Sequence, residues 1–372
     1  MKLEGLRVVD LGMYLPTPLI TQMMADHGAT VISVEPPGGQ PTRKLAGLGA
    51  DGESLWFKAM HRGKRSIVLD LKCQGDRDVL TALADKADVV IESFRPGVAA
   101  RLGIDAARLR MRNPRLVHCS LSAFGQSGPL SALPGHDMAA QAYTGFVALN
   151  GQPGGLPAVP GAPTADMLGG MTAFTAILMA LYRRESTGRG DAIDISMYDS
   201  LLAWAPHFLS VIQADRGSAP ARLASAIYGS AFYNIYRTGD GKAVVLAGPE
   251  PHYVRNLLHA LGREDLLAAA LAAPGPAHDQ VIAAFRKIFA ERDLADWCGF
   301  LGRLDISWAP VLSMIEAFDH PHVKARAMLV TDDTGALAPG TPLKFAEEPA
   351  SIAHRAPALD EHHEMIRTRG FE

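Results

Sequence analysis

The chain has 372 residues, of which 48% are hydrophobic and 20% charged, a composition that is typical of a globular protein and excludes a disordered one. Its 36 Lys and Arg residues against 39 Asp and Glu residues give a formal net charge of -3, which argues against a general nucleic-acid-binding protein. The length predicts two domains.

The first 200 residues alternate between short apolar runs and helical patterns. Runs rich in Val, Ile and Leu predict buried strands at residues 6–11, 31–35, 66–70, 88–92 and 116–121. Helical patterns at residues 19–27 and 76–87 lie between such runs, and strand, helix, strand is the unit of a parallel sheet. We therefore predict an open α/β domain at residues 1–200, whose ligands lie beyond the carboxyl ends of its strands.

The second half of the chain predicts a smaller domain. A polar, small-residue stretch within residues 201–224 is typical of a linker. Residues 232–237 and 243–246 flank a Gly-Asp-Gly turn and predict a hairpin, and helical patterns follow at 253–261, 265–272, 279–290 and 294–303. We expect a small α+β domain at residues 225–325 and a return segment at residues 326–372 that packs on the large domain.

Several features exclude other classes of protein. Glu4, Arg7 and Asp10 interrupt any N-terminal apolar run, so we expect no signal peptide. The apolar segment at residues 167–182 is short and contains Gly169 and Gly170, which favours a buried core helix over a membrane span. The three cysteines are widely spaced and predict neither disulfides nor a metal site. We predict a cytoplasmic protein without membrane or nucleic-acid partners.

One acid has an unusual place in the sequence. Asp166 stands between a Pro/Gly-rich loop and the apolar segment, where its carboxylate could cap the N-terminus of a helix. It could equally be a catalytic group, because Gly169 and Gly170 allow another backbone or a substrate to come close. The residues alone leave both interpretations open.

Nine blocks, spread over nearly the whole chain and in the same order, resemble the family III CoA-transferases, the group that includes the α-methylacyl-CoA racemases. They are LEGLRVVDLG, ADHGATVISVEPPGGQPTR, RGKRSIVLDLK, VIESFRPGVAARLGI, SLSAFGQSGP, GHD, RRESTGRGDAIDISMYDS, YRTGDGK and DHPHVKARAML. The resemblance implies a Rossmann-like large domain and a small domain in an interlaced homodimer. It also implies an acyl-CoA thioester substrate and no cofactor beyond coenzyme A as part of that substrate.

Basic side chains gather near the ends of the first four predicted strands, namely Arg43, Arg62, Lys64, Arg65, Lys72 and Arg95. Guanidinium and ammonium groups pair with phosphates, which coenzyme A carries, although a solvated basic face is the alternative. Similar proteins bind the CoA nucleotide with these blocks, so the resemblance implies that these six residues contact coenzyme A.

The resemblance gives Asp166 two roles that exclude one another. In transferases the matching acid attacks the acyl-CoA thioester and forms an acyl-aspartyl anhydride. In racemases it pairs with the His of the GHD motif, which is His136 here, across the α-carbon of the substrate. A proton α to a thioester is a very weak acid, so its removal needs a positioned base and donors that hold the enolate oxygen. We favour epimerisation of a 2-methylacyl-CoA, with CoA transfer as the alternative.

Two further residues belong to this expected site. Glu250 matches a Glu-Pro of the racemases and would orient His136 or help to close the site. We also expect Asp137 to contact the CoA substrate. Its carboxylate either orients the His136 ring or caps the following helix. The chain departs from the racemases at Ala139, Gln141 and Leu168. A non-catalytic acyl-CoA-binding protein is a remote alternative, because a binder does not need His136, Asp166 and Glu250.

Overall fold

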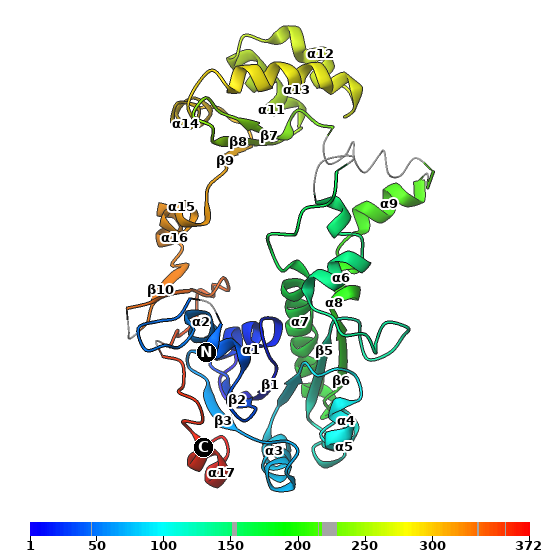
Figure 1. The fold of residues 1–372 in the computed structure, drawn as a ribbon, viewed down its shortest axis with the longest axis vertical. Helices are drawn as coiled ribbons and strands as arrows, with labels where there is room; N and C mark the ends of the chain where they lie inside the picture. The colour runs from blue at the N-terminus through cyan, green and yellow to red at the C-terminus, as the bar shows by residue number, and fades with distance from the viewer. Residues whose placement is uncertain (46, 151–154, 215, 218–228, 333–334, 354) are drawn as a thin grey trace. The chain divides into compact units, whose positions relative to one another are not determined.

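The computed structural model describes residues 1–372 apart from residues 46, 151–154, 215, 218–228, 333–334 and 354. The chain divides into a large unit, Met1–Trp204 with Pro321–Glu372, and a small unit, Ala205–His320 (Figure 1). Residues 215 and 218–224 of the linker expected within residues 201–224 lie outside the described residues.

The large unit is built on a six-stranded parallel sheet with the strand order β3-β2-β1-β4-β5-β6. Its strands are β1 (Arg7–Leu11), β2 (Thr30–Glu35), β3 (Arg65–Val68), β4 (Val89–Glu92), β5 (Val117–Ser122) and β6 (Ala192–Ser196). The order reverses between β1 and β4, which marks the switch point of a doubly wound fold. The first five strands confirm the predicted runs. The predictions omit β6, because residues 192–194 of this short edge strand are exposed or half-buried and Asp194 interrupts its apolar run.

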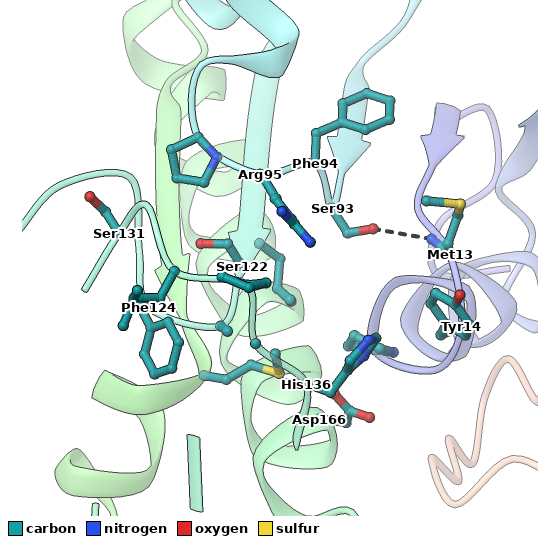
Figure 2. A pocket seen from close by; sticks show the side chains of 18 residues that line it. Met13, Tyr14, Ser93, Phe94, Arg95, Ser122, Phe124, Ser131, His136 and Asp166 are labelled. Carbon is teal, nitrogen blue, oxygen red and sulfur yellow. Dashed lines mark hydrogen bonds between the residues drawn. The ribbon is translucent and has the colours of Figure 1, made fainter. Parts of the chain in front are cut away.

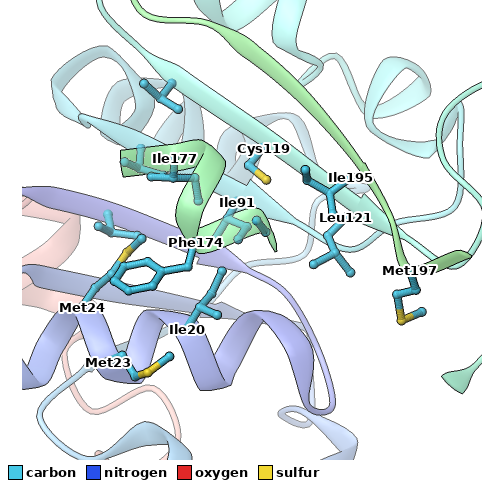
Figure 3. Close-up of a cluster of buried hydrophobic side chains, with 14 of the residues drawn as sticks. Ile20, Met23, Met24, Ile91, Cys119, Leu121, Phe174, Ile177, Ile195 and Met197 are labelled. Carbon is cyan, nitrogen blue, oxygen red and sulfur yellow. The ribbon is translucent and has the colours of Figure 1, made fainter. Parts of the chain in front are cut away.

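Side chains alternate between the two faces of this sheet and fill two cores. Helices α1 (Pro16–Asp26), α7 (Thr164–Thr187) and α8 (Met197–Ala203) pack on one face, where Ile20, Ile91, Leu121 and Phe174 are buried (Figure 3). Helices α3 (Gln74–Lys86), α5 (Ala106–Arg112) and α17 (His363–Arg369) cover the other face through a second cluster that includes Leu80, Leu109 and Ile366. The remaining elements of this unit are η1 (Pro41–Lys44), α2 (Leu55–His61), α4 (Val98–Leu102), α6 (Asp137–Tyr143), η2 (Val147–Leu149), α16 (Pro321–Ala325), β10 (Leu329–Thr331) and β11 (Leu337–Pro339).

Helix α7 is long and apolar enough to cross a membrane by length and composition alone. In the structure it is a core helix of the large unit, since Ala173, Phe174 and Ile177 are buried in the cluster above. Near its C-terminus the guanidinium of Arg184 is also buried and lies 3.0 Å from a carboxylate oxygen of Asp88. This arrangement agrees with the core helix predicted from the sequence.

The chain end is tied to the edge strand β3 of the large unit. The Arg65 guanidinium donates to the carbonyl of Phe371 at 2.6 Å, and the backbone N–H of Ser66 donates to the His362 ring at 3.2 Å. The side chain of Ile366 is buried on the same face of the sheet. These contacts hold the last residues against the large unit.

The small unit has its own core. The antiparallel strands β7 (Tyr233–Arg237), β8 (Ala243–Ala247) and β9 (Trp308–Pro310) form its sheet, and the β7-β8 hairpin confirms the predicted one. Its helical segments are α9 (Pro206–Ala214), α11 (Pro251–Ala260), η3 (Glu264–Leu266), α12 (Leu267–Ala270), α13 (Pro276–Phe289), α14 (Leu294–Leu301) and α15 (Met314–Asp319). The single helix predicted at residues 265–272 is therefore a 3-10 turn followed by a short α-helix. Phe285, Phe289 and Trp297 fill the core with edge-to-face and tilted ring pairs.

Candidate active site

A pocket of about 350 Å³ opens at the carboxyl edge of the parallel sheet, as the predicted fold requires. Loops that follow β1, β4 and β5 line it, together with the segment before α6 and the first turn of α7 (Figure 2). The lining residues are Met13, Tyr14, Pro16, Ser93, Phe94, Arg95, Pro96, Leu121, Ser122, Ala123, Phe124, Ser131, Leu133, Pro134, Gly135, His136, Asp166 and Met197. The structure therefore brings His136 and Asp166 to one cavity.

The segment around His136 is fixed by close packing. A Cβ at Gly135 would lie 2.7 Å from the Phe124 ring and 2.8 Å from the Ala123 side chain, so only glycine permits this approach. His136 then occupies the N-cap position of α6, but its side chain makes no capping hydrogen bond. The ring is exposed and lies edge-to-face with Tyr14, with 5.6 Å between ring centroids. The imidazole is thus available to a ligand in the pocket.

The start of α7 shows whether Asp166 caps the N-terminus of this helix. The N-cap residue of α7 is Pro163, and Asp166 lies inside the first turn. The cap is supplied from outside the helix, because Asp137 Oδ1 accepts hydrogen bonds from the backbone N–H of Ala165 at 2.7 Å and of Asp166 at 3.1 Å. Asp166 is therefore not the helix cap. The predicted capping role belongs to Asp137, and the helix that its side chain caps is α7 and not α6.

The Asp166 carboxyl has an unusual environment. Burial raises its pKa from an ordinary 3.8 to about 7, and the neighbouring Asp137 carboxylate adds to the shift. The first turn of a helix favours a negative charge, so burial and like charge outweigh the helix dipole here. A pKa in this range suits a group that both gives and takes protons near neutral pH.

Close helix packing places Asp166 beside the other pocket elements. A Cβ at Gly170 would lie 3.0 Å from the carbonyl oxygen of Pro16, and one at Gly169 would lie 2.8 Å from the Met197 side chain. The glycine pair thus allows the N-terminal part of α7 to contact α1 and α8 at the pocket, which agrees with the close backbone approach that the sequence predicts.

A second pocket, of about 590 Å³, adjoins the first one. Both pockets include Met13 and Phe94 in their walls. The second pocket lies over the carboxyl ends of β1, β2 and β3, and most of its lining is apolar, with Leu11, Val34 and Leu69 among its residues. Lys72 is its cationic lining residue and is exposed. Together the two pockets could hold one long ligand that passes Met13 and Phe94.

The six basic residues predicted to contact coenzyme A have different surroundings. The buried Arg43 guanidinium makes a two-pronged ion pair with Glu35, at 2.7 and 2.8 Å, and lies over the Phe57 ring. Arg62 is also buried and pairs with Asp26 at 2.7 Å. The buried Lys64 ammonium lies 3.3 Å from Asp10 and donates to Thr21 at 2.7 Å. These three cations already have partners inside the fold.

Arg65, Lys72 and Arg95 complete the basic set. Arg65 donates to the carbonyl of Phe371, as described above. The Arg95 side chain extends into the first pocket (Figure 2), and its guanidinium makes no hydrogen bond or ion pair with any described residue. The structure therefore places Lys72 and Arg95 in the walls of the two pockets, where an anionic group could reach them.

Glu250 belongs to the small unit. It occupies the N-cap position of α11, makes no capping hydrogen bond through its side chain, and is exposed. Its assignment to the active site stays a prediction.

Sequence reasoning missed part of the pocket wall. Tyr14, Ser93 and Ser122 line the pocket and are absent from the predicted site. Each lies at or just beyond the carboxyl end of a parallel strand. The rule that ligands lie at this edge of the sheet could have identified them.

Comparisons with known proteins identify the family of the chain. CoA-transferase family III matches residues 3–363. The chain is 36% identical to an acetyl-CoA:oxalate CoA-transferase of Acetobacter aceti, over 98% of this chain and 94% of that protein. It is 34% identical to the human alpha-methylacyl-CoA racemase, over 98% of this chain and 92% of that protein.

The fold has solved counterparts as well. A crystal structure of a CAIB/BAIF family protein from Brucella suis superposes with a TM-score of 0.87 at 30% identity, and covers 100% of this chain and 99% of that one. The resemblance of the nine sequence blocks is confirmed over almost the full length. The chain therefore belongs to CoA-transferase family III and is an acyl-CoA enzyme of that superfamily.

Proposed function

We propose that the enzyme epimerises a 2-methylacyl-CoA by 1,1-proton transfer, in which His136 and Asp166 remove and return protons on opposite faces of the α-carbon. The observation that carries this proposal is that both side chains line one pocket and that the Asp166 carboxyl has a pKa of about 7. A pKa close to the operating pH lets one carboxyl act as a general acid in one direction and as a general base in the other. His136 is the proposed partner, because histidine is the side chain that most often serves as a general acid or base.

The proton balance of the reaction follows from this pair. In one direction the neutral His136 ring takes the α-proton, the electron pair moves onto the thioester oxygen, and Asp166 gives its proton to the opposite face of the α-carbon. In the other direction ionised Asp166 takes the proton and protonated His136 returns one. The enolate oxygen needs donors, and Arg95 and the hydroxyls of Ser93 and Ser122 line the same pocket.

The adjoining pockets suit the two ends of an acyl-CoA. We place the thioester and acyl group in the pocket of His136 and Asp166, and the nucleotide in the larger apolar pocket, where Lys72 can meet a phosphate. The pantetheine chain would pass Met13 and Phe94, which belong to both walls. The phosphate role assigned to Arg43, Arg62 and Lys64 stays a prediction.

The test is isotope exchange. A single enantiomer of a 2-methylacyl-CoA incubated with enzyme in deuterium oxide should gain deuterium at the α-carbon and lose optical purity. His136→Ala should remove inversion, and Asp166→Asn should do the same with an unchanged fold by circular dichroism. Wild-type enzyme that leaves the α-hydrogen in place contradicts the proposal.

The second candidate function is CoA transfer between carboxylic acids. The relatives named as transferases favour it, and so do Ala139, Gln141 and Leu168, at which the chain departs from the racemases. Ionised Asp166 would attack the thioester carbonyl, the C–S bond would break, and CoA would depart as its thiolate. The acyl group would stay on Asp166 as an acyl-aspartyl anhydride. Hydroxylamine then releases the acyl group as its hydroxamate. Trapping without α-exchange would establish transfer in place of epimerisation.

We propose further that the enzyme is a homodimer, and the resemblance of the sequence to interlaced relatives adds the interlacing as a prediction. Helix α7 exposes Leu178, Met179 and Tyr182, whose exposed fractions reach 67% for Met179 and 85% for Tyr182. Such apolar side chains on neighbouring turns are typical of a protein interface. Light scattering should give twice the chain mass of 39.7 kDa, and Met179→Glu with Tyr182→Glu should lower it. A wild-type monomer at micromolar concentration contradicts the dimer.

A further inference from the structure

We propose that Tyr14 is a positioning residue for His136, which holds the imidazole ring in the orientation that reaches the α-carbon of the substrate. The proposal rests on the proton-transfer function proposed above. Tyr14 lies in the loop between β1 and α1 and lines the pocket, and its ring meets the His136 ring at a 90° interplanar angle with 5.6 Å between centroids (Figure 2).

The backbone of Tyr14 is strained. Its φ angle is +66°, in the left-handed region that glycine favours and that a bulky side chain rarely adopts. A loop that only connected β1 to α1 would be more stable with Gly at this position. Strained residues of this kind persist where the surrounding structure holds them, and they concentrate at functional sites.

The neighbouring backbone holds this strain from both sides. The Gly12 N–H donates to the buried Asp10 carboxylate at 2.9 Å, and the Met13 N–H donates to Ser93 Oγ at 3.1 Å (Figure 2). On the other side Pro16 begins α1 with a fixed φ angle. The chain between these fixed points has little freedom, and its geometry directs the Tyr14 ring towards His136.

Packing alone does not account for a tyrosine here. The Tyr14 side chain is 39% exposed, and its hydroxyl has no hydrogen-bond partner among the described residues. The Tyr14 ring packs edge-to-face with the His136 ring, and the His136 side chain makes no capping hydrogen bond. Edge-to-face packing restricts the rotation of an otherwise unfastened imidazole. The aromatic ring, and not the hydroxyl, is therefore the part that acts on His136.

Three substitutions separate this role from a structural one. Tyr14→Leu removes the aromatic ring, and Tyr14→Gly also relieves the backbone strain. We expect each to lower the α-exchange rate about tenfold, while the melting temperature of Tyr14→Gly is equal to or above that of the wild type. Tyr14→Phe keeps the ring and should restore the rate to within about threefold of the wild type. A rate in Tyr14→Gly equal to that of the wild type would overturn the proposal.

The two enantiomers provide a sharper readout. His136 and Asp166 act on opposite faces, so each removes the α-proton from one enantiomer of the substrate. Loss of the ring in Tyr14→Leu should slow deuterium uptake from the His136-facing enantiomer more than from the other one. General damage to the fold or to CoA binding slows both equally, and that outcome would overturn a specific effect on His136.

A measurement without substrate distinguishes failure of this inference from failure of the proposed function. In protein labelled with 13C at histidine Cε1, the His136 signal is identified by its absence in His136→Gln. Removal of the ring current in Tyr14→Leu should shift that signal, and Tyr14→Phe should leave it in place. If the wild type shows no α-exchange but the shift occurs, the function is wrong and the positioning contact stands. If the signal does not move in Tyr14→Leu, the positioning role is wrong.

Discussion

The carboxylate of Asp137 and the backbone N–H of Asp166 are joined by a 3.1 Å hydrogen bond across 29 positions of sequence. The same Asp137 oxygen accepts from Ala165 at 2.7 Å, and Gln141 donates to the other oxygen at 2.6 Å. One acid therefore fixes the start of α7 and adds to the rise that burial causes in the pKa of Asp166 on that turn. Because Asp137 follows His136 directly, this contact also ties the two proposed proton carriers together.

A first prediction separates the cap of Asp137 from its charge. Asp137→Asn keeps an oxygen that can accept from α7 but removes the negative charge, so the pKa of Asp166 should fall below about 7. Asp137→Ala removes the cap and should lower the free energy of unfolding by about 1–2 kcal/mol. The pH profile of α-exchange and urea unfolding measure the two effects. An unshifted profile in Asp137→Asn would show that the Asp137 charge does not act on Asp166.

A second prediction uses pH to decide between the two candidate reactions. When His136 is the base, Asp166 must be protonated, so kcat/KM for that enantiomer should fall about tenfold per pH unit above about 7. A nucleophilic Asp166 must be ionised, so transfer should instead become faster as pH rises through about 7. Initial rates between pH 5.5 and 8.5 give the direction. Asp137→Asn is the matched control, because it should move either limb to lower pH.

A third prediction concerns stability. Burial raises the pKa of Asp166 in the folded state, so the folded protein binds more protons than the unfolded chain between about pH 4 and 7. The free energy of unfolding therefore falls as pH rises through that window, because ionising Asp166 is harder in the folded protein than in the unfolded chain. Above the window this decrease is complete. Asp166→Asn should stabilise the fold by about 1–2 kcal/mol at pH 8.5 and by almost nothing at pH 4, because partial exposure reduces the full effect. Urea unfolding at both pH values tests this, and equal effects would contradict the raised pKa.

A fourth prediction compares two lysines. Lys64→Met leaves the Asp10 carboxylate buried without its cation and should lower the free energy of unfolding by about 3–5 kcal/mol. Lys72→Met, at the exposed wall of the larger pocket, should leave unfolding within about 0.5 kcal/mol of the wild type and should raise KM for acyl-CoA several-fold. Denaturation curves and steady-state kinetics distinguish them. A stable Lys64→Met protein with a raised KM would instead support a CoA contact by Lys64.

Local patterns in the sequence predicted much of the fold. Apolar runs identified five of the six parallel strands, and the Gly-Asp-Gly turn identified the hairpin of the small unit. Strand β6 differs, because residues 192–194 at the sheet edge are exposed or only half-buried and do not need an apolar run. Family blocks identified His136 and Asp166, and the structure brings both to one pocket.

The sequence by itself determined the class of fold, the family and the acid and histidine of the candidate site, because these depend on residue types and on order along the chain. Only the tertiary structure decided what surrounds them. The basic residues look alike in the sequence but have different surroundings in the fold, since Lys64 is buried against Asp10 while Lys72 and Arg95 line pockets. It also decided that Asp137 caps α7 and that Tyr14 meets His136. Burial and contact between distant residues exist only after folding, and they set the pKa of Asp166 and the ring contact of His136 on which the proposed chemistry depends.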